Sequence, residues 1–137
     1  MKTEPILPGS TIGCLGGGQL GRMFALAARK MGYRVHSVDP TMDSPAGQIS
    51  DREFNVPFND IPTLIEFAKG VDVVTYEFEN IPVEALDALA PLVALRPGRD
   101  VLYTTQNRRR EKEFLLRNTF PCAPIRPAMP KSSSFTP

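Results

Sequence analysis

Three glycines near the N-terminus have the spacing of a phosphate-binding turn. Gly16, Gly18 and Gly21 form the pattern G-x-G-x-x-G between a short apolar segment, residues 11–15, and a segment with apolar residues at helical spacing. Glycine allows a sharp turn, and the unpaired N–H groups at the start of the following helix attract an anion. The pattern predicts a phosphate beside Gly18. A strand-to-helix turn needs glycines whatever it binds, so a purely structural role stays open.

An acid lies where a dinucleotide-binding domain needs one. Asp39 ends a predicted strand, residues 33–39, after the glycine pattern. In dinucleotide-binding domains an acid at this place accepts hydrogen bonds from the adenine ribose. One hypothesis is therefore the NAD-binding domain of an oxidoreductase. Asp39 is followed by Pro40 in a turn-rich loop, where aspartate is also an ordinary turn residue, so both interpretations are open.

Two further acids follow the most strand-like segment, residues 71–76. Glu77 and Glu79 should emerge at the carboxyl edge of the sheet, close to the glycine turn. Their spacing of two places both on one side of an extended chain, with Tyr76 and Phe78 on the other. Carboxylates so placed accept hydrogen bonds from hydroxyls or an amine. The alternative is a pair of solvated loop residues, although loops at this edge often carry function.

Charge and composition exclude several partners. The chain has 16 basic and 15 acidic residues and a net charge of +1. It therefore has no long-range electrostatic field that would attract nucleic acid or an anionic membrane. Arg108, Arg109 and Arg110 belong to the one basic concentration, which Glu111 and Glu113 interrupt. We interpret it as a solvated helix face, from which one arginine can still reach a nucleotide phosphate.

Cysteine and histidine usage gives no metal site. Cys14 and Cys122 lie far apart and His36 is the sole histidine, so no metal ligands are predicted. We expect Cys14 to be a small buried side chain and His36 to be packed or at a sheet edge. The chain shows no leader pattern and no apolar stretch of the ~20 residues that span a bilayer. A cytoplasmic protein without membrane contact is expected.

Strand-like and helical segments alternate along the chain. Strands are expected at residues 11–15, 33–39, 71–76 and 93–95, a turn at 98–100, and helices at 19–31, 61–69, 83–90 and 107–116. This order predicts an α/β fold, a doubly wound parallel sheet covered by helices on both faces. We expect one domain over residues 1–120, and a linker or tail rich in proline and serine over residues 121–137.

Several motifs in order resemble one enzyme family. The segments are GGGQLGRM at residues 16–23, DP at 39–40, VVTYEFEN at 73–80 and QNR at 106–108. Together they resemble the signature of the 5-(carboxyamino)imidazole ribonucleotide synthase family, and the resemblance covers residues 12 to about 124. It implies that the fold is the Rossmann-like domain that precedes the ATP-grasp domains in these ligases of purine biosynthesis.

The resemblance implies a reaction and its ligands. ATP and bicarbonate give an activated carboxyl phosphate, the amine of aminoimidazole ribonucleotide is carboxylated, and magnesium is required. By the same resemblance, Gln19 and Leu20 lie beside the ribonucleotide together with Gly18. Glu77 and Glu79 face its ribose or imidazole part, and Arg108 reaches toward an ATP phosphate. The surface of a homodimer is also implied, whereas a third hypothesis keeps the fold as a non-catalytic assembly module.

The sequence departs from the family pattern at its end. The family continues with two domains that supply an ATP-binding lysine, a glycine-rich lid and carboxylates for magnesium, and residues 131–137 cannot hold them. The ATP-grasp domains, and with them any catalytic residue, are therefore not expected within these 137 residues.

We predict that a polypeptide of these 137 residues has no ATP-dependent carboxylase activity. Phosphoryl transfer requires magnesium and fixed cations to surround the phosphates together, and this sequence offers one side at most. The measurement is ADP release with ATP, magnesium, bicarbonate and aminoimidazole ribonucleotide, which should not exceed the blank. ADP formation that depends on the ribonucleotide would contradict the prediction.

Overall fold

A five-stranded sheet forms the centre of the molecule. The computed structural model describes residues 5–77 and 79–124. All strand pairs are parallel, and the order across the sheet is β3-β2-β1-β4-β5. The strands are β1 (Thr11–Leu15), β2 (Arg34–Val38), β3 (Arg52–Phe54), β4 (Val73–Tyr76) and β5 (Ala94–Leu95). The predicted α/β architecture with a doubly wound parallel sheet is confirmed.

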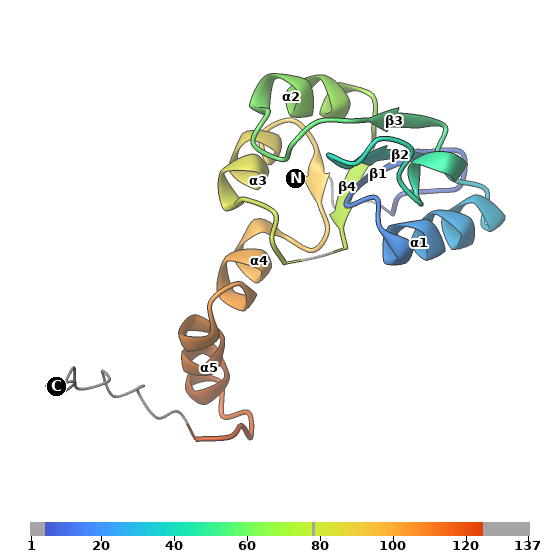
Figure 1. Ribbon diagram of the computed structural model, residues 1–137. Helices are drawn as coiled ribbons and strands as arrows, with labels where there is room; N and C mark the ends of the chain where they lie inside the picture. The colour runs from blue at the N-terminus through green and yellow to red at the C-terminus, as the bar shows by residue number, and fades with distance from the viewer. Residues whose placement is uncertain (1–4, 78, 125–137) are drawn as a thin grey trace, which may run out of the picture.

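Helices cover both faces of this sheet (Figure 1). One face carries α1 (Gln19–Lys30) and the short 3-10 helix η1 (Gly47–Ile49), and the other carries α2 (Ile61–Lys69) and α3 (Val83–Leu89). The larger core lies on the α2 and α3 side, where Phe67 is fully buried and meets Phe54 edge to face at 5.4 Å between ring centroids. On the α1 side, Ala25 and Ala28 pack on Val35.

Local sequence signals set the ends of the helices. Gly32 has φ +87° directly after α1, a left-handed conformation that glycine adopts without strain. Asp60 caps α2 by accepting a hydrogen bond from the Thr63 N–H at 3.2 Å. Asn107 caps α5 (Arg108–Arg117) in the same way, through the N–H groups of Arg109 and Arg110. These end signals explain why α1, α2 and α5 were predicted to within one residue of their observed bounds.

Two elements differ from the sequence-based expectation. Residues 98–100 were expected to be a turn, but they begin α4 (Arg99–Thr105), with Gly98 as its N-cap. Turns and helix N-termini favour the same residue types, so the sequence does not separate them here. The helix is stabilised because it buries Leu102 in the core. Strand β3 was not predicted at all. It has three residues, and two of them, Arg52 and Glu53, are charged, as is usual at a sheet edge.

The C-terminal helices lie away from the sheet. Helix α4 follows β5 and packs on the α/β body through Leu102, and α5 continues beyond the body, as Figure 1 shows. The expected boundary near residue 120 follows the end of α5 at Arg117, and most of the expected tail, residues 125–137, lies outside the described residues. No helix within the described part of the chain is both long and apolar enough to cross a membrane.

We predict that Phe67→Ala lowers the free energy of unfolding by about 3–5 kcal/mol, because it empties the centre of the larger core. The control is Phe120→Ala, since Phe120 is 56% exposed. Its effect should stay within about 0.5 kcal/mol. Urea unfolding monitored by circular dichroism measures both values. Equal losses in the two variants would contradict the assignment of Phe67 to the core.

Candidate functional site

The order of the strands creates one crevice at the carboxyl edge of the sheet. From β1 the chain runs outward to β2 and β3, then returns to the other side of β1 to form β4 and β5. The loops that follow β1 and β4 therefore leave the sheet side by side in opposite directions. Their closeness is direct, because the Glu77 N–H donates to the Leu15 carbonyl at 3.1 Å. Ligands of such sheets bind at this point.

A pocket of about 340 Å³ lies in this crevice. Its walls come from the turn after β1, the start of α1 and the first residues after β2 and β4. The lining residues are Gly16, Gly18, Gln19, Leu20, Gly21, Asp39 and Glu77. Four of the five residues that we predicted to contact substrate, namely all except Glu79, thus meet around one pocket.

The three glycines of the pattern differ in their surroundings. Gly16 has φ +111°, which makes the sharp exit from β1. A Cβ on Gly21 would overlap the carbonyl oxygen of Gly16, so this glycine permits α1 to pack against the turn. A Cβ on Gly18 would have no described atom within 4 Å. Gly18 therefore leaves open space beside the start of α1, on the side of the pocket.

The start of α1 offers backbone N–H groups to this space. Gly18 is the N-cap, no side chain caps this helix, and its first turn has no acidic residue. The helix dipole therefore adds a partial positive charge to the N–H groups at this end. An anion such as a phosphate suits this wall of the pocket.

The opposite wall carries Glu77. Burial raises the pKa of the Glu77 carboxyl. A partly buried carboxyl group facing the pocket can accept hydrogen bonds from hydroxyls or an amine. Burial, followed by the charge of Glu77, raises the pKa of the Cys14 thiol to about 12. The thiol is therefore protonated at neutral pH and serves as a buried packing group, as expected for Cys14.

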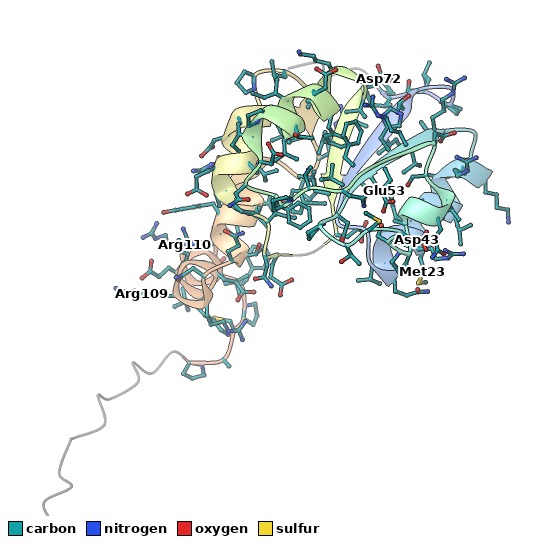
Figure 2. The ribbon with its side chains drawn as sticks, turned by 45° about the horizontal axis from the view of Figure 1, so that its top comes forward. Met23, Asp43, Glu53, Asp72, Arg109 and Arg110 are labelled. Carbon is teal, nitrogen blue, oxygen red and sulfur yellow. The ribbon has the colours of Figure 1, made fainter. Side chains whose placement is uncertain are left out.

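The remaining predicted residues lie outside the lining. Glu79 is exposed, and its carbonyl accepts a hydrogen bond from the Gln106 side chain at 2.6 Å. Arg108 is exposed on α5, where it pairs with Glu111. Figure 2 shows the neighbouring Arg109 and Arg110 at the opposite end of the molecule from Met23 of α1. His36 packs beside Phe54, and burial lowers the pKa of its imidazole.

Two contacts at the candidate site were not predicted from the sequence. Gln106 joins the end of α4 to the loop that follows β4, because its amide also donates to the Ile81 carbonyl at 2.5 Å. Asp39 accepts a hydrogen bond from the backbone N–H of Gly17 at 2.7 Å. Neither contact has a signal in the sequence, since both join segments that are more than 20 residues apart.

Comparison with known proteins decides the family. Residues 9–106 match the family model described as "Ribonucleotide synthetase preATP-grasp domain". The chain belongs to this family. It is 46% identical over 115 residues to N5-carboxyaminoimidazole ribonucleotide synthase of Bacillus subtilis, a match that covers 84% of the chain and 30% of the relative. The match favours this family over the NAD-dependent oxidoreductase considered from Asp39.

Solved structures give the same result for this preATP-grasp domain. A crystal structure of the ADP complex of an N5-carboxyaminoimidazole ribonucleotide synthetase superimposes with a TM-score of 0.85 at 46% identity, over 89% of the chain and 32% of that protein. The Staphylococcus aureus synthetase, also complexed with ADP, gives 0.79 at 37% identity, over 83% and 31%. The chain therefore spans about a third of the length of these relatives.

The described residues hold no cluster of ligands for the magnesium that the sequence resemblance implies. Among residues 5–77 and 79–124, no three His, Cys, Asp or Glu side chains come together to hold a metal ion. No step of chemistry is therefore assigned to a metal at the pocket.

We predict that serine has different effects on stability at two adjacent glycines. Gly17→Ser should lower the free energy of unfolding by about 1–3 kcal/mol, because its Cβ overlaps Ser44 and lies 2.6 Å from the Cβ of Asp39. Gly18→Ser should be neutral or slightly stabilising, because it enters open space and serine is a good N-cap. Thermal unfolding checks both. Equal destabilisation would contradict the open wall at Gly18.

Proposed function

We propose that this chain binds aminoimidazole ribonucleotide as the N-terminal domain of a ligase that carboxylates this substrate with ATP and bicarbonate. The observation that carries the proposal is the pocket at the carboxyl edge, with the open turn at Gly18 on one wall and Glu77 on the other. A ribonucleotide has a matching polarity, since its phosphate is an anion and its sugar and base carry hydroxyl and amino donors.

Each wall has a separate role in this proposal. The phosphate binds at the start of α1, where Gly18 lets it approach the backbone and the N–H groups of the first turn face it. Gln19 and Leu20 lie beside the ribonucleotide, and Glu77 accepts hydrogen bonds from its ribose or imidazole part. Both ends of the substrate are then fixed, which holds the reacting amine in a defined place.

The remaining steps belong to residues that come from elsewhere in such a ligase. Bicarbonate attacks the terminal phosphorus of ATP, which forms carboxyphosphate and releases ADP. The amine then attacks the carboxyl carbon, the carbon–oxygen bond to phosphate breaks, and the nitrogen loses a proton. In this proposal Arg108 contacts an ATP phosphate, and Glu79, in the loop after β4, faces the ribose or imidazole part of the ribonucleotide. Magnesium accompanies ATP, the enzyme is a cytoplasmic homodimer, and the described residues contribute binding and orientation.

We predict that Gly18→Val weakens the binding of aminoimidazole ribonucleotide by about tenfold or more, because the side chain fills the space beside the N–H groups. Isothermal titration calorimetry measures the affinity. The matched control is Gly98→Val, since Gly98 is also a helix N-cap with no described atom within 4 Å of an added Cβ. Both variants should lose similar stability, and the control should keep wild-type affinity.

Three outcomes separate this proposal from its alternatives. Equal affinity in Gly18→Val and wild type would contradict the role of the turn. Protection of the wild-type chain from thermal unfolding by NAD, without a response to the ribonucleotide, would favour an oxidoreductase domain. Self-association without a response to either ligand would favour an assembly module.

A further inference from the structure

Helix α1 turns small residues toward the sheet and large apolar residues away from it. Its buried residues are Gly21, Ala25 and Ala28, which let the helix lie close to the strands. Four large apolar side chains of the helix and its C-cap are instead between 51% and 62% exposed: Leu20, Met23, Leu26 and Met31. A surface helix usually has its large apolar side chains on the buried face and polar ones outside. Helix α1 therefore presents an apolar face to its surroundings.

Most of this face is one continuous stripe along the helix. Residues at steps of three and four lie on the same side of a helix, and here they are Leu20, Met23, Ala27 and Met31. We call these four residues the α1 stripe, and the exposed Leu26 lies beside it. Figure 2 shows Met23 at the outer edge of the molecule. The small Ala27 near the middle allows a second helix to approach closely.

The arginines of α1 do not interrupt the stripe. Arg22 donates hydrogen bonds to the Pro45 carbonyl and to the Gln48 side chain, both at 2.8 Å. Arg29 pairs with Asp51 at 2.6 Å. The two arginines are seven residues apart and share a different side of the helix from the stripe. Their charges are thus held by the segment between β2 and β3, and the stripe stays apolar.

The area of the exposed face matches a dimer interface. Four large side chains that are more than half exposed offer about 400 Å² of apolar surface, a size that is often functional. A stable homodimer buries about 800 Å² on each partner, and about 65% of that area is apolar. The four side chains therefore supply most of the apolar area that a dimer needs, and Ala27 and the half-buried Phe24 adjoin them.

The charges of α1 favour an antiparallel pairing with a second copy of the same helix. The last turn carries Arg29 and Lys30, and α1 has no acidic residue. In a parallel pair these basic turns would lie side by side and repel each other, whereas an antiparallel pair separates them and sets the helix dipoles in opposite directions. A two-fold axis near the middle of α1 brings Leu20 of each copy to Met31 of the other.

We propose that the α1 stripe is the surface through which two copies of this chain form an antiparallel two-fold dimer. This inference deepens the proposed function, because it rests on the homodimer named there and assigns it a surface, but it requires no ligand. Leu20 also lines the pocket, so the interface ends at the edge of the candidate site in each copy.

Sedimentation equilibrium of the 137-residue chain measures the dissociation constant of the dimer. Met23→Glu should weaken the dimer by about a hundredfold or more, because each copy would bury a carboxylate in an apolar contact. The matched control is Met42→Glu, since Met42 is 80% exposed in the loop after β2. It should keep the wild-type constant. Both methionines are exposed in a single copy, so both variants should keep the wild-type circular dichroism spectrum.

A measurement on the wild-type chain tests the pairing directly. Leu20 and Met31 lie about 16 Å apart along one helix, too far for a nuclear Overhauser contact within a single copy. Copies labelled in their leucine methyl groups are mixed with copies labelled in their methionine methyl groups. A contact between Leu20 and Met31 should then appear across the interface. Contacts of Leu20 with Leu20 in its place would overturn the antiparallel pairing.

Two results would overturn the inference as a whole. One is a wild-type chain that stays monomeric up to about 1 mM, which would leave the stripe to another part of such a ligase or to a different protein. The other is an equal dissociation constant for Met23→Glu and Met42→Glu. A dimer that binds no ribonucleotide would support this inference and contradict the proposed ligand, whereas a monomer that binds it would do the reverse.

Discussion

Leu15 pairs with Val38 of β2 on one side and with Tyr76 of β4 on the other, and this parallel register determines where each functional residue lies. Because three strands end at the same level, the segments that follow them leave the sheet together. This shared end brings together the glycine turn, Asp39 and Glu77, which follow the three strands. A shift of one residue in either pairing would move the side chains after that strand to the other face of the sheet.

The consecutive glycines after β1 show how one short turn satisfies two demands. Gly17 is covered by protein, and its N–H and carbonyl both have protein partners. Gly18 is uncovered and begins a helix without a side-chain cap. The first glycine gives the turn a fixed geometry, while the second leaves its polar groups accessible. The rigid residue of the turn and the accessible one are therefore neighbours in the chain.

Much of the fold was predictable because its signals are local. The glycine after α1, the cap at Asp60 and the β-branched run before Tyr76 each act over a few residues. The α4 helix was mistaken for a turn because its start resembles one, and only the burial of Leu102 distinguishes the two. Strand β3 could not be recognised, since its pairing with β2 is set by distant residues and it has no alternation of its own.

The location of the candidate site was predictable from the sequence. The hydrogen bonds that hold its residues in position were not. Gly18, Gln19, Leu20 and Glu77 line the pocket that the sequence motifs indicated. Asp39 was weighed as a ligand residue or an ordinary turn residue, whereas the structure gives its carboxylate two backbone partners. Hydrogen bonds between a side chain and the backbone of a remote segment leave no periodicity in a sequence, so reasoning from pattern does not reach them.

The hydrogen bonds of Gln106 have a mechanical consequence. This residue lies between α4 and α5, and its amide holds the carbonyls of Glu79 and Ile81 in the loop after Glu77. Leu102 anchors α4 in the core, whereas α5 projects from the body of the molecule (Figure 1). The two hydrogen bonds of Gln106 therefore join the α4–α5 junction to the loop that follows Glu77. A displacement of α5 relative to the body would load these bonds, so the junction of the helices and one wall of the pocket are mechanically connected.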